Sequence, residues 1–166
     1  MDADPRQRAL QKAYRLLALR AHSEAELHAK LREGGFAEPV IAAALTRCRE
    51  LGYLDDAAFA RQRALALAVN RLLGDRRIAV DLRGKGIPEE LCREAIAAAR
   101  REISAEEAIE RLLGSKTKER MADAATDQRL KAKMVRSLLG KGFSQGLIFS
   151  KLKRTQEDGF HDDDGE

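Results

Sequence analysis

Hydrophobic residues in this chain repeat one short pattern three times. Each copy has two apolar residues four positions apart, a glycine four positions after the second, and a further apolar residue directly behind the glycine. Apolar residues at i and i+4 share one helix face, and glycine readily adopts the left-handed conformation that ends a helix. The pattern predicts a helix, a glycine turn and a second helix at each copy: Leu27, Leu31, Gly35 and Phe36; Ile78, Leu82, Gly86 and Ile87; Met134, Leu138, Gly142 and Phe143.

The three copies indicate a repeat protein with uneven linkers, because Gly35, Gly86 and Gly142 are 51 and 56 residues apart. In the middle copy either Gly84 or Gly86 can provide the left-handed residue. A capping box that opens with Ser23 starts the first helix of the first copy. Helix-start signals ahead of each copy add a further helix, such as the capping box that opens with Ser104. We therefore expect an all-α fold of three tandem three-helix repeats at residues 1–51, 52–102 and 103–155, followed by an acidic disordered tail at 156–166.

The helix boundaries follow from caps, prolines and glycines. Predicted helices cover about 5–21, 24–33, 39–50, 56–74, 75–83, 88–101, 105–113, 122–139 and 144–155. Between the first two repeats, Tyr53 and Leu54 are expected to form a plug, and Asp55 or Asp56 to cap the next helix. Ser144 is expected to cap the last helix.

Composition supports this helical interpretation. The hydrophobic fraction is 44%, which is enough to bury cores, and strand-favouring residues are sparse, with four valines and four threonines. Cys48 and Cys92 are too far apart in sequence to suggest a zinc site and are expected to be reduced core thiols. The sequence has neither a signal peptide nor a membrane span, so we expect a cytoplasmic protein.

Charge is distributed unevenly. The net charge is +4, but residues 157–166 carry six acids and no lysine or arginine, so the rest of the chain has 31 − 21 = +10. Such a cationic body suits DNA or an acidic protein surface. The candidate binding residues are Arg71, Arg76, Arg77, Arg83, Lys85, Lys131, Lys133, Arg136, Lys141, Lys151, Lys153 and Arg154.

Catalytic chemistry finds little support in the sequence. His22 and His28 lie off a common helix face and are expected at the surface, while His161 in the tail could bind a metal weakly. Residues 114–117 resemble a phosphate loop superficially, but no strand precedes them and the glycine spacing is wrong. We therefore expect no enzyme activity, no cofactor and no resident metal.

Two non-enzymatic alternatives remain open besides a generic helical scaffold. The helix–turn–helix units and the positive charge also fit a DNA-binding protein that lacks sequence preference. Against it, Phe36, Phe59 and Phe143 look buried, which leaves no aromatic platform for stacking bases. The acidic tail could fold back on the basic third repeat, although solvated disorder is the simpler expectation.

Four ordered motifs over about residues 9–152 resemble the RecX family of bacterial regulatory proteins. They are Ala13-Tyr14-Arg15-Leu16-Leu17 with Ser23-x2-Glu26-Leu27-x2-Lys30-Leu31 and Gly35-Phe36; Leu51-Gly52-Tyr53-Leu54-Asp55-Asp56-x2-Phe59-Ala60; Arg71-x2-Gly74-x2-Arg77-Ile78-x3-Leu82-x2-Lys85-Gly86-Ile87; and Leu138-Leu139-x2-Gly142-Phe143. The third repeat departs most, since Gly146 falls in the first turn of its last helix, and the acidic tail lies outside the resemblance.

The resemblance implies a curved, elongated monomer built from three-helix repeats. It also implies a partner, the RecA recombinase filament on single-stranded DNA, whose ATPase and strand-exchange activities the family inhibits. The protein would thereby modulate recombinational DNA repair and the SOS response. A modular helical array with distributed charge is compatible with such a partner, because it can contact several filament subunits.

Overall fold

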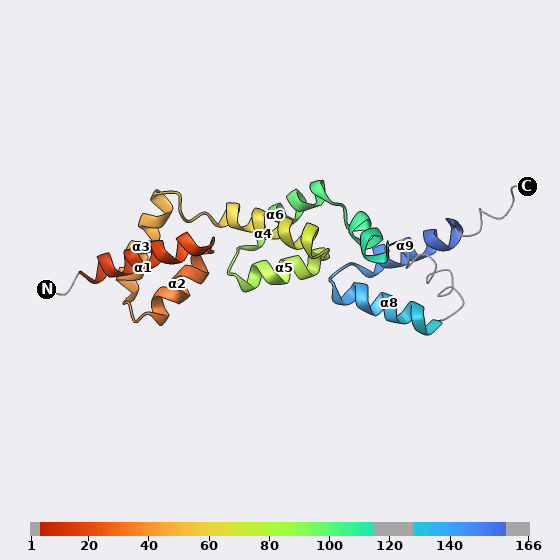
Figure 1. Cartoon of the computed structure of the whole chain (residues 1–166), viewed down its shortest axis with the longest axis horizontal. Helices are drawn as coiled ribbons and strands as arrows, with labels where there is room; N and C mark the ends of the chain where they lie inside the picture. The colour runs from red at the N-terminus through yellow and green to blue at the C-terminus, as the bar shows by residue number, and fades with distance from the viewer. Residues whose placement is uncertain (1–3, 115–127, 159–166) are drawn as a thin grey trace, which may run out of the picture. The chain divides into compact units, whose positions relative to one another are not determined.

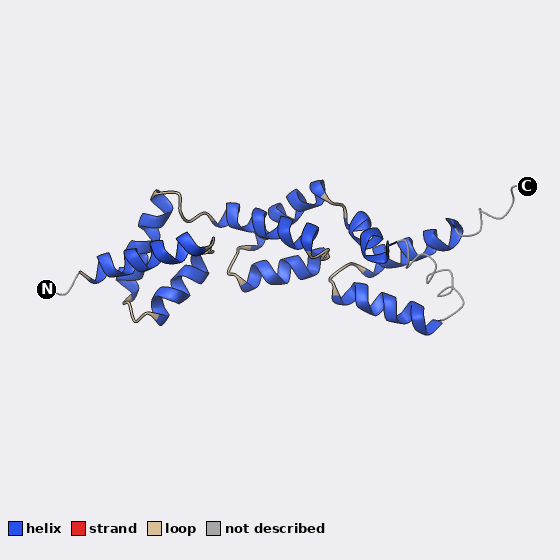
Figure 2. Cartoon of the chain, viewed as in Figure 1, coloured by secondary structure: helices blue, strands red, loops and turns tan. Residues whose placement is uncertain are grey.

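The computed structural model describes residues 4–114 and 128–158. These residues form helices joined by short turns, with no strand among them, which confirms the predicted all-α fold (Figure 2). By contacts the chain divides into two compact units, one of Met1–Arg63 with Asp81–Ala95 and one of Ala64–Val80 with Ile96–Glu166. This grouping follows contacts rather than repeats, and the repeat boundaries at 51, 102 and 155 stay a prediction.

The first three helices pack on one another: α1 (Pro5–Leu19), α2 (Glu24–Glu33) and α3 (Glu38–Glu50) (Figure 1). Asp4 caps α1, and Ser23 and Glu26 form the predicted capping box of α2, each side chain bonding the other's backbone N–H. The helices enclose a core of small and aliphatic side chains, chiefly Ala9, Ala13, Leu27, Leu31, Ile41, Leu45 and Cys48.

The next three helices are α4 (Asp56–Asn70), α5 (Asp75–Gly84) and α6 (Glu89–Glu102). Asp55 caps α4, because its carboxylate accepts a hydrogen bond from the Ala58 N–H at 2.9 Å. The helix ends at Asn70 rather than near residue 74, and Leu72 behind it has a left-handed φ of +49°. The plug prediction is wrong for Tyr53, which is 59% exposed, whereas Leu54 is buried in the core of the first three helices.

The remaining described helices are residues 105–114, α8 (Gln128–Gly140) and α9 (Gln145–Asp158). Ser104 and Ser144 cap the first and last of these by accepting N–H bonds from Glu107 and Leu147. Helix α9 runs to Asp158, beyond the predicted helix end at 155, and the rest of the predicted tail lies outside the described residues. The structure does not describe residues 115–127. This range contains most of the break predicted at 114–117 and the start of the helix predicted at 122–139.

The repeated glycine pattern forms the same turn in each copy. The glycine N–H bonds the carbonyl three residues back, and the following apolar residue's N–H bonds the carbonyl five residues back, as in a Schellman motif. Gly35, Gly86 and Gly142 have φ values of +79°, +75° and +93°. In the middle copy Gly86, and not Gly84, is therefore the left-handed residue.

One histidine prediction is wrong. His22 is buried, with 5% exposure, and its Nδ1 lies 2.9 Å from the Arg20 carbonyl oxygen. Its position in the connection between α1 and α2 removes it from solvent, which helical spacing does not reveal. His28 is half-buried and contacts the Glu38 carboxylate at 2.8 Å.

Candidate functional site

The turn at Gly86 packs against the start of α2 inside the first compact unit. The Ser23 hydroxyl donates a 2.5 Å hydrogen bond to the Lys85 carbonyl, and the Lys85 ammonium lies 2.7 Å from the Glu26 carboxylate. A β-carbon at residue 86 would overlap the β-carbon of Ala25, so the turn approaches the helix as closely as glycine permits. We call this contact between the Gly86 turn and the start of α2 a joint. Lys85, a predicted binding residue, is part of it.

Glu26 is the electrostatic centre of this joint. Burial alone would raise the pKa of its carboxyl, but hydrogen bonds from Arg20, Lys85 and the Ser23 N–H outweigh burial and lower the pKa to about 2. The Arg20 guanidinium spans both carboxylate oxygens, at 3.2 and 3.3 Å. The carboxylate therefore stays ionised at neutral pH and holds the two cations in place.

A second joint of the same kind occurs in the other compact unit. The Gly74 N–H donates to the Lys141 carbonyl at 2.8 Å, and the Arg76 N–H donates to the Gly142 carbonyl at 3.2 Å. A β-carbon at residue 142 would lie 2.5 Å from the Arg77 nitrogen, so glycine is required here too. This joint brings the backbones of three predicted binding residues together: Arg76, Arg77 and Lys141.

The structure divides the predicted basic residues into two classes. Three are engaged in ion pairs: Lys85 with Glu26, Arg83 with Glu89, and Lys151 with Glu110. The others form no ion pair with a carboxylate of the described residues: Arg71, Arg76, Arg77, Lys131, Lys133, Arg136, Lys141, Lys153 and Arg154. These nine belong to the second compact unit, and most are exposed.

Helix α1 carries basic residues that the sequence reasoning missed. It contains four cations and no acid: Arg6, Arg8, Lys12 and Arg15. None of these forms an ion pair with a carboxylate among residues 4–114 and 128–158. The signal in the sequence is the absence of Asp and Glu from residues 5–19.

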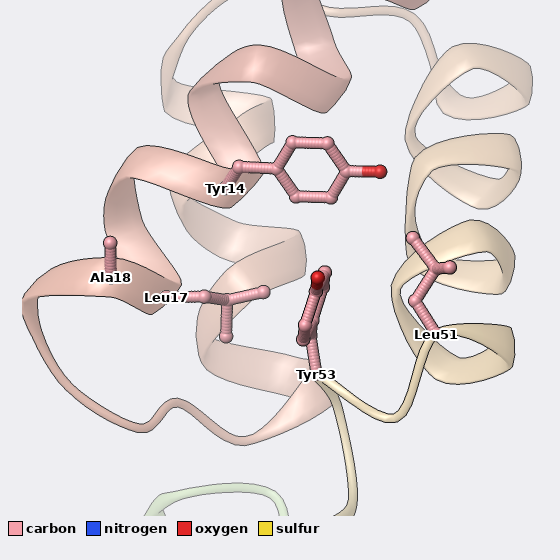
Figure 3. Close-up of a pocket in the computed structure, with 5 residues that line it drawn as sticks. All are labelled: Tyr14, Leu17, Ala18, Leu51 and Tyr53. Atoms are coloured by element: carbon pink, nitrogen blue, oxygen red, sulfur yellow. The ribbon is translucent and has the colours of Figure 1, made fainter.

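A pocket of about 480 Å³ opens beside α1, lined by Tyr14, Leu17, Ala18, Leu51 and Tyr53 (Figure 3). The two tyrosine rings meet edge to face, with centroids 5.8 Å apart and planes at 87°. Tyr14, Leu17 and Ala18 come from α1, whereas Leu51 and Tyr53 follow the end of α3. The predicted plug residue Tyr53 therefore lines an open pocket within the first unit.

The described residues provide little for catalysis or metal binding. No group of three or more His, Cys, Asp or Glu side chains that could hold a metal occurs in this part of the chain. Cys48 and Cys92 are buried and form no disulfide, and burial raises the pKa of both thiols, which disfavours the reactive thiolate. Among the helices that the structure describes, none is long and apolar enough to cross a membrane.

Comparisons with known proteins agree with the repeat pattern. Family models match the RecX first three-helix domain at residues 9–48 and the RecX second three-helix domain at residues 55–96. A protein from Chlorobaculum tepidum named regulatory protein RecX is 35% identical over 153 residues, covering 92% of this chain and 91% of that protein. A Thermus thermophilus protein with the same name is 37% identical over 151 residues, covering 91% and 94%.

Solved structures of similar proteins support the fold. A crystal structure of RecX from Lactobacillus salivarius superposes with a TM-score of 0.78 at 20% identity, covering 94% of this chain and 99% of that one. Another, of regulatory protein RecX, gives a TM-score of 0.74 at 23% identity, covering 91% and 72%. At these identities the structural likeness is evidence for the fold of this chain and not for its function.

Proposed function

Because the chain belongs to the RecX family, we propose that it is a non-enzymatic regulator that binds the RecA recombinase filament on single-stranded DNA. Binding inhibits the filament's ATPase and strand-exchange activities and so modulates recombinational repair and the SOS response. Family membership is the observation that carries this proposal. The three repeats, at 1–51, 52–102 and 103–155, would each contribute part of the contact surface.

The unpaired cations provide the physical support for an acidic partner. Arg76 and Arg77 lie in the first turn of α5, where the helix dipole disfavours positive charge by roughly 0.3–1 kcal/mol each. Both side chains are exposed and form no ion pair with the described carboxylates. A cation that the helix dipole disfavours and that has no carboxylate partner in the described residues is available to an external anion.

The DNA-binding alternative gains one observation from the structure. Phe59 and Phe143 are buried as predicted, and Phe36 is half-buried, but Phe149 on α9 is 45% exposed. Lys153 follows it by one helical turn and is also exposed. An aromatic side chain one turn from a lysine is a feature of single-strand binding surfaces, so direct DNA binding stays the second candidate.

The first experiment is ATP hydrolysis by the cognate RecA on single-stranded DNA, titrated with this protein. A single-strand-binding protein of unrelated fold controls for simple competition for the DNA. We expect inhibition well below the concentration that saturates the DNA. Inhibition that begins only once the DNA itself is covered would overturn filament recognition and favour the DNA-binding alternative.

Charge reversal tests the proposed basic residues. The double variant Arg76→Glu and Arg77→Glu should weaken inhibition more than tenfold. It should not destabilise the fold, because it places acids at a helix start, where the helix dipole favours negative charge. The matched control is Arg61→Glu with Arg101→Glu, which changes the same charge at two exposed arginines outside the candidate set. Equal losses of inhibition in the two double variants would show that the effect depends on net charge alone. Arg76 and Arg77 would then no longer be candidates for the contact surface.

A second reversal, of Lys131, Lys133 and Arg136 together, tests the exposed and half-buried cations of α8. We expect weaker inhibition and a shallower dependence of binding on salt, because fewer counterions are released when fewer anionic groups are neutralised. Unchanged inhibition and an unchanged salt dependence would remove α8 from the contact surface.

A further inference from the structure

The pocket beside α1 is built from side chains that a folded chain ordinarily covers. Among the lining side chains, Tyr53 is 59% exposed and Leu51 is 38% exposed. Tyr14 and Leu17 are half-buried and form the inner wall (Figure 3). The volume of about 480 Å³ lies in the range of roughly 300–1,000 Å³ that binding pockets occupy.

The helix that forms one wall of the pocket also carries a cation. Arg15 follows Tyr14 on α1, is exposed, and forms no ion pair with a described carboxylate. The nearest acids in sequence are already engaged, Glu50 by Arg47 at 3.1 Å and Asp55 by the Ala58 N–H at 2.9 Å. An occupant therefore meets an apolar cavity with an available cation beside it.

The lining distinguishes between an apolar side chain and a nucleobase. Leu17, Ala18 and Leu51 offer no side-chain hydrogen-bonding groups, and the two tyrosine hydroxyls are the polar groups of the lining side chains. A base inserted here would leave polar edge atoms against aliphatic carbon, which costs free energy, whereas a leucine or phenylalanine side chain meets no such cost. The lining therefore favours a protein ligand over a single-stranded nucleic acid.

We infer that this pocket is an anchor for an apolar side chain of a partner protein segment that carries carboxylates next to that side chain. The apolar side chain fills the space between Tyr14, Tyr53 and Leu51, and a flanking carboxylate pairs with Arg15. Tyrosine and arginine are the residues that most often dominate binding energy at protein interfaces. The inference rests on the proposed function in one respect: that function names the RecA filament as the carrier of the segment.

The composition of the chain makes the pocket directly observable. The protein has two tyrosines and no tryptophan, and both tyrosines line this pocket. Full-length protein labelled with 3-fluorotyrosine therefore gives two fluorine resonances, both from the pocket, which Tyr53→Phe assigns. The probe is the peptide acetyl-Asp-Glu-Leu-Glu-Asp-amide, with a leucine-to-serine version and an oligothymidylate as comparisons.

We expect the leucine peptide to shift both resonances, and the serine peptide and the oligothymidylate to leave them in place. No shift with the leucine peptide would overturn the pocket as an anchor. A larger shift with the oligothymidylate than with the leucine peptide would overturn a protein ligand in favour of nucleic acid. This arm contains no RecA, so its outcome is independent of whether the proposed function holds.

The second arm measures filament inhibition with a matched pair at an exposed lining residue, Ala18→Glu and Ala18→Gln. The two side chains have the same shape, so both narrow the pocket, but glutamate also repels an acidic segment. We expect a loss of a few-fold for the glutamine variant and more than tenfold for the glutamate variant. Leu19→Ser, at an exposed position outside the lining, should inhibit like the wild type.

The outcomes separate the two proposals. Equal inhibition by the wild type and both Ala18 variants would overturn the pocket as a filament contact while leaving the proposed function intact. Equal losses in the glutamate and glutamine variants would overturn the acidic character of the segment. Absence of inhibition by the wild type would instead overturn the proposed function, and the fluorine experiment would then decide the pocket by itself.

Discussion

Gly86→Ala should destabilise the first compact unit much more than Gly35→Ala, although both glycines end a helix in the same kind of turn. The φ values are +75° and +79°, so alanine meets nearly the same backbone strain at both positions. The surroundings differ: a β-carbon at residue 86 would overlap Ala25, whereas no described atom outside the neighbouring residues lies within 4 Å of one at residue 35.

The expected magnitudes follow from these contacts. A left-handed alanine costs about 1 kcal/mol, which is the whole effect at Gly35. At Gly86 the turn must also move away from α2, which breaks the 2.5 Å bond from the Ser23 hydroxyl to the Lys85 carbonyl, about 1 kcal/mol. The ion pair of Lys85 with Glu26 adds about 0.5–1 kcal/mol, for a total near 3 kcal/mol.

Urea unfolding of the full chain, followed by far-UV circular dichroism, measures the difference. Native-state hydrogen exchange should accompany it, because the two compact units need not unfold together. Ala25→Gly removes the methyl group that residue 86 would strike, so in the Gly86→Ala background it should restore about 1 kcal/mol. Equal destabilisation by Gly35→Ala and Gly86→Ala, or no recovery with Ala25→Gly, would refute the joint as described.

Three further predictions concern the ion pairs and the second joint. The pKa of Glu26 is held at about 2 against an ordinary value of 4.5, so its stabilisation is complete above pH 4.5 and is lost as the pH falls toward 2. Glu26→Gln should therefore flatten the dependence of unfolding free energy on pH in that window, and an unchanged slope would contradict the assignment. Gly142→Ala should selectively speed hydrogen exchange of the Gly74 amide, which donates to the Lys141 carbonyl, and continued protection would argue against the second joint. Asp81→Asn removes the negative charge and one of the two oxygens that accept Arg63 bonds at 2.6 and 2.9 Å, a partly exposed pair worth about 1 kcal/mol. Arg63→Gln in the same background should add little further loss in urea unfolding.

The sequence by itself determined the elements of this protein. Helix faces, caps and glycine turns depend on interactions within about five residues, so Ser23, Ser144 and Gly35 could be assigned their local roles from spacing alone. Burial also followed where the apolar period was regular, as for Leu31 and Phe143. The resemblance to the RecX family rested on these same local motifs and is confirmed.

The tertiary structure decided which residues remain available to a partner. Ser23 and Lys85 are 62 positions apart, and no local pattern indicates that the Gly86 turn packs on α2 and takes Lys85 into an ion pair. The exposure of Tyr53 and the burial of His22 likewise depend on how connections fold back on helices. Helical periodicity shows which face of a helix is apolar, but contacts between segments distant in sequence determine what covers that face, and these contacts left the Tyr14–Tyr53 pocket open.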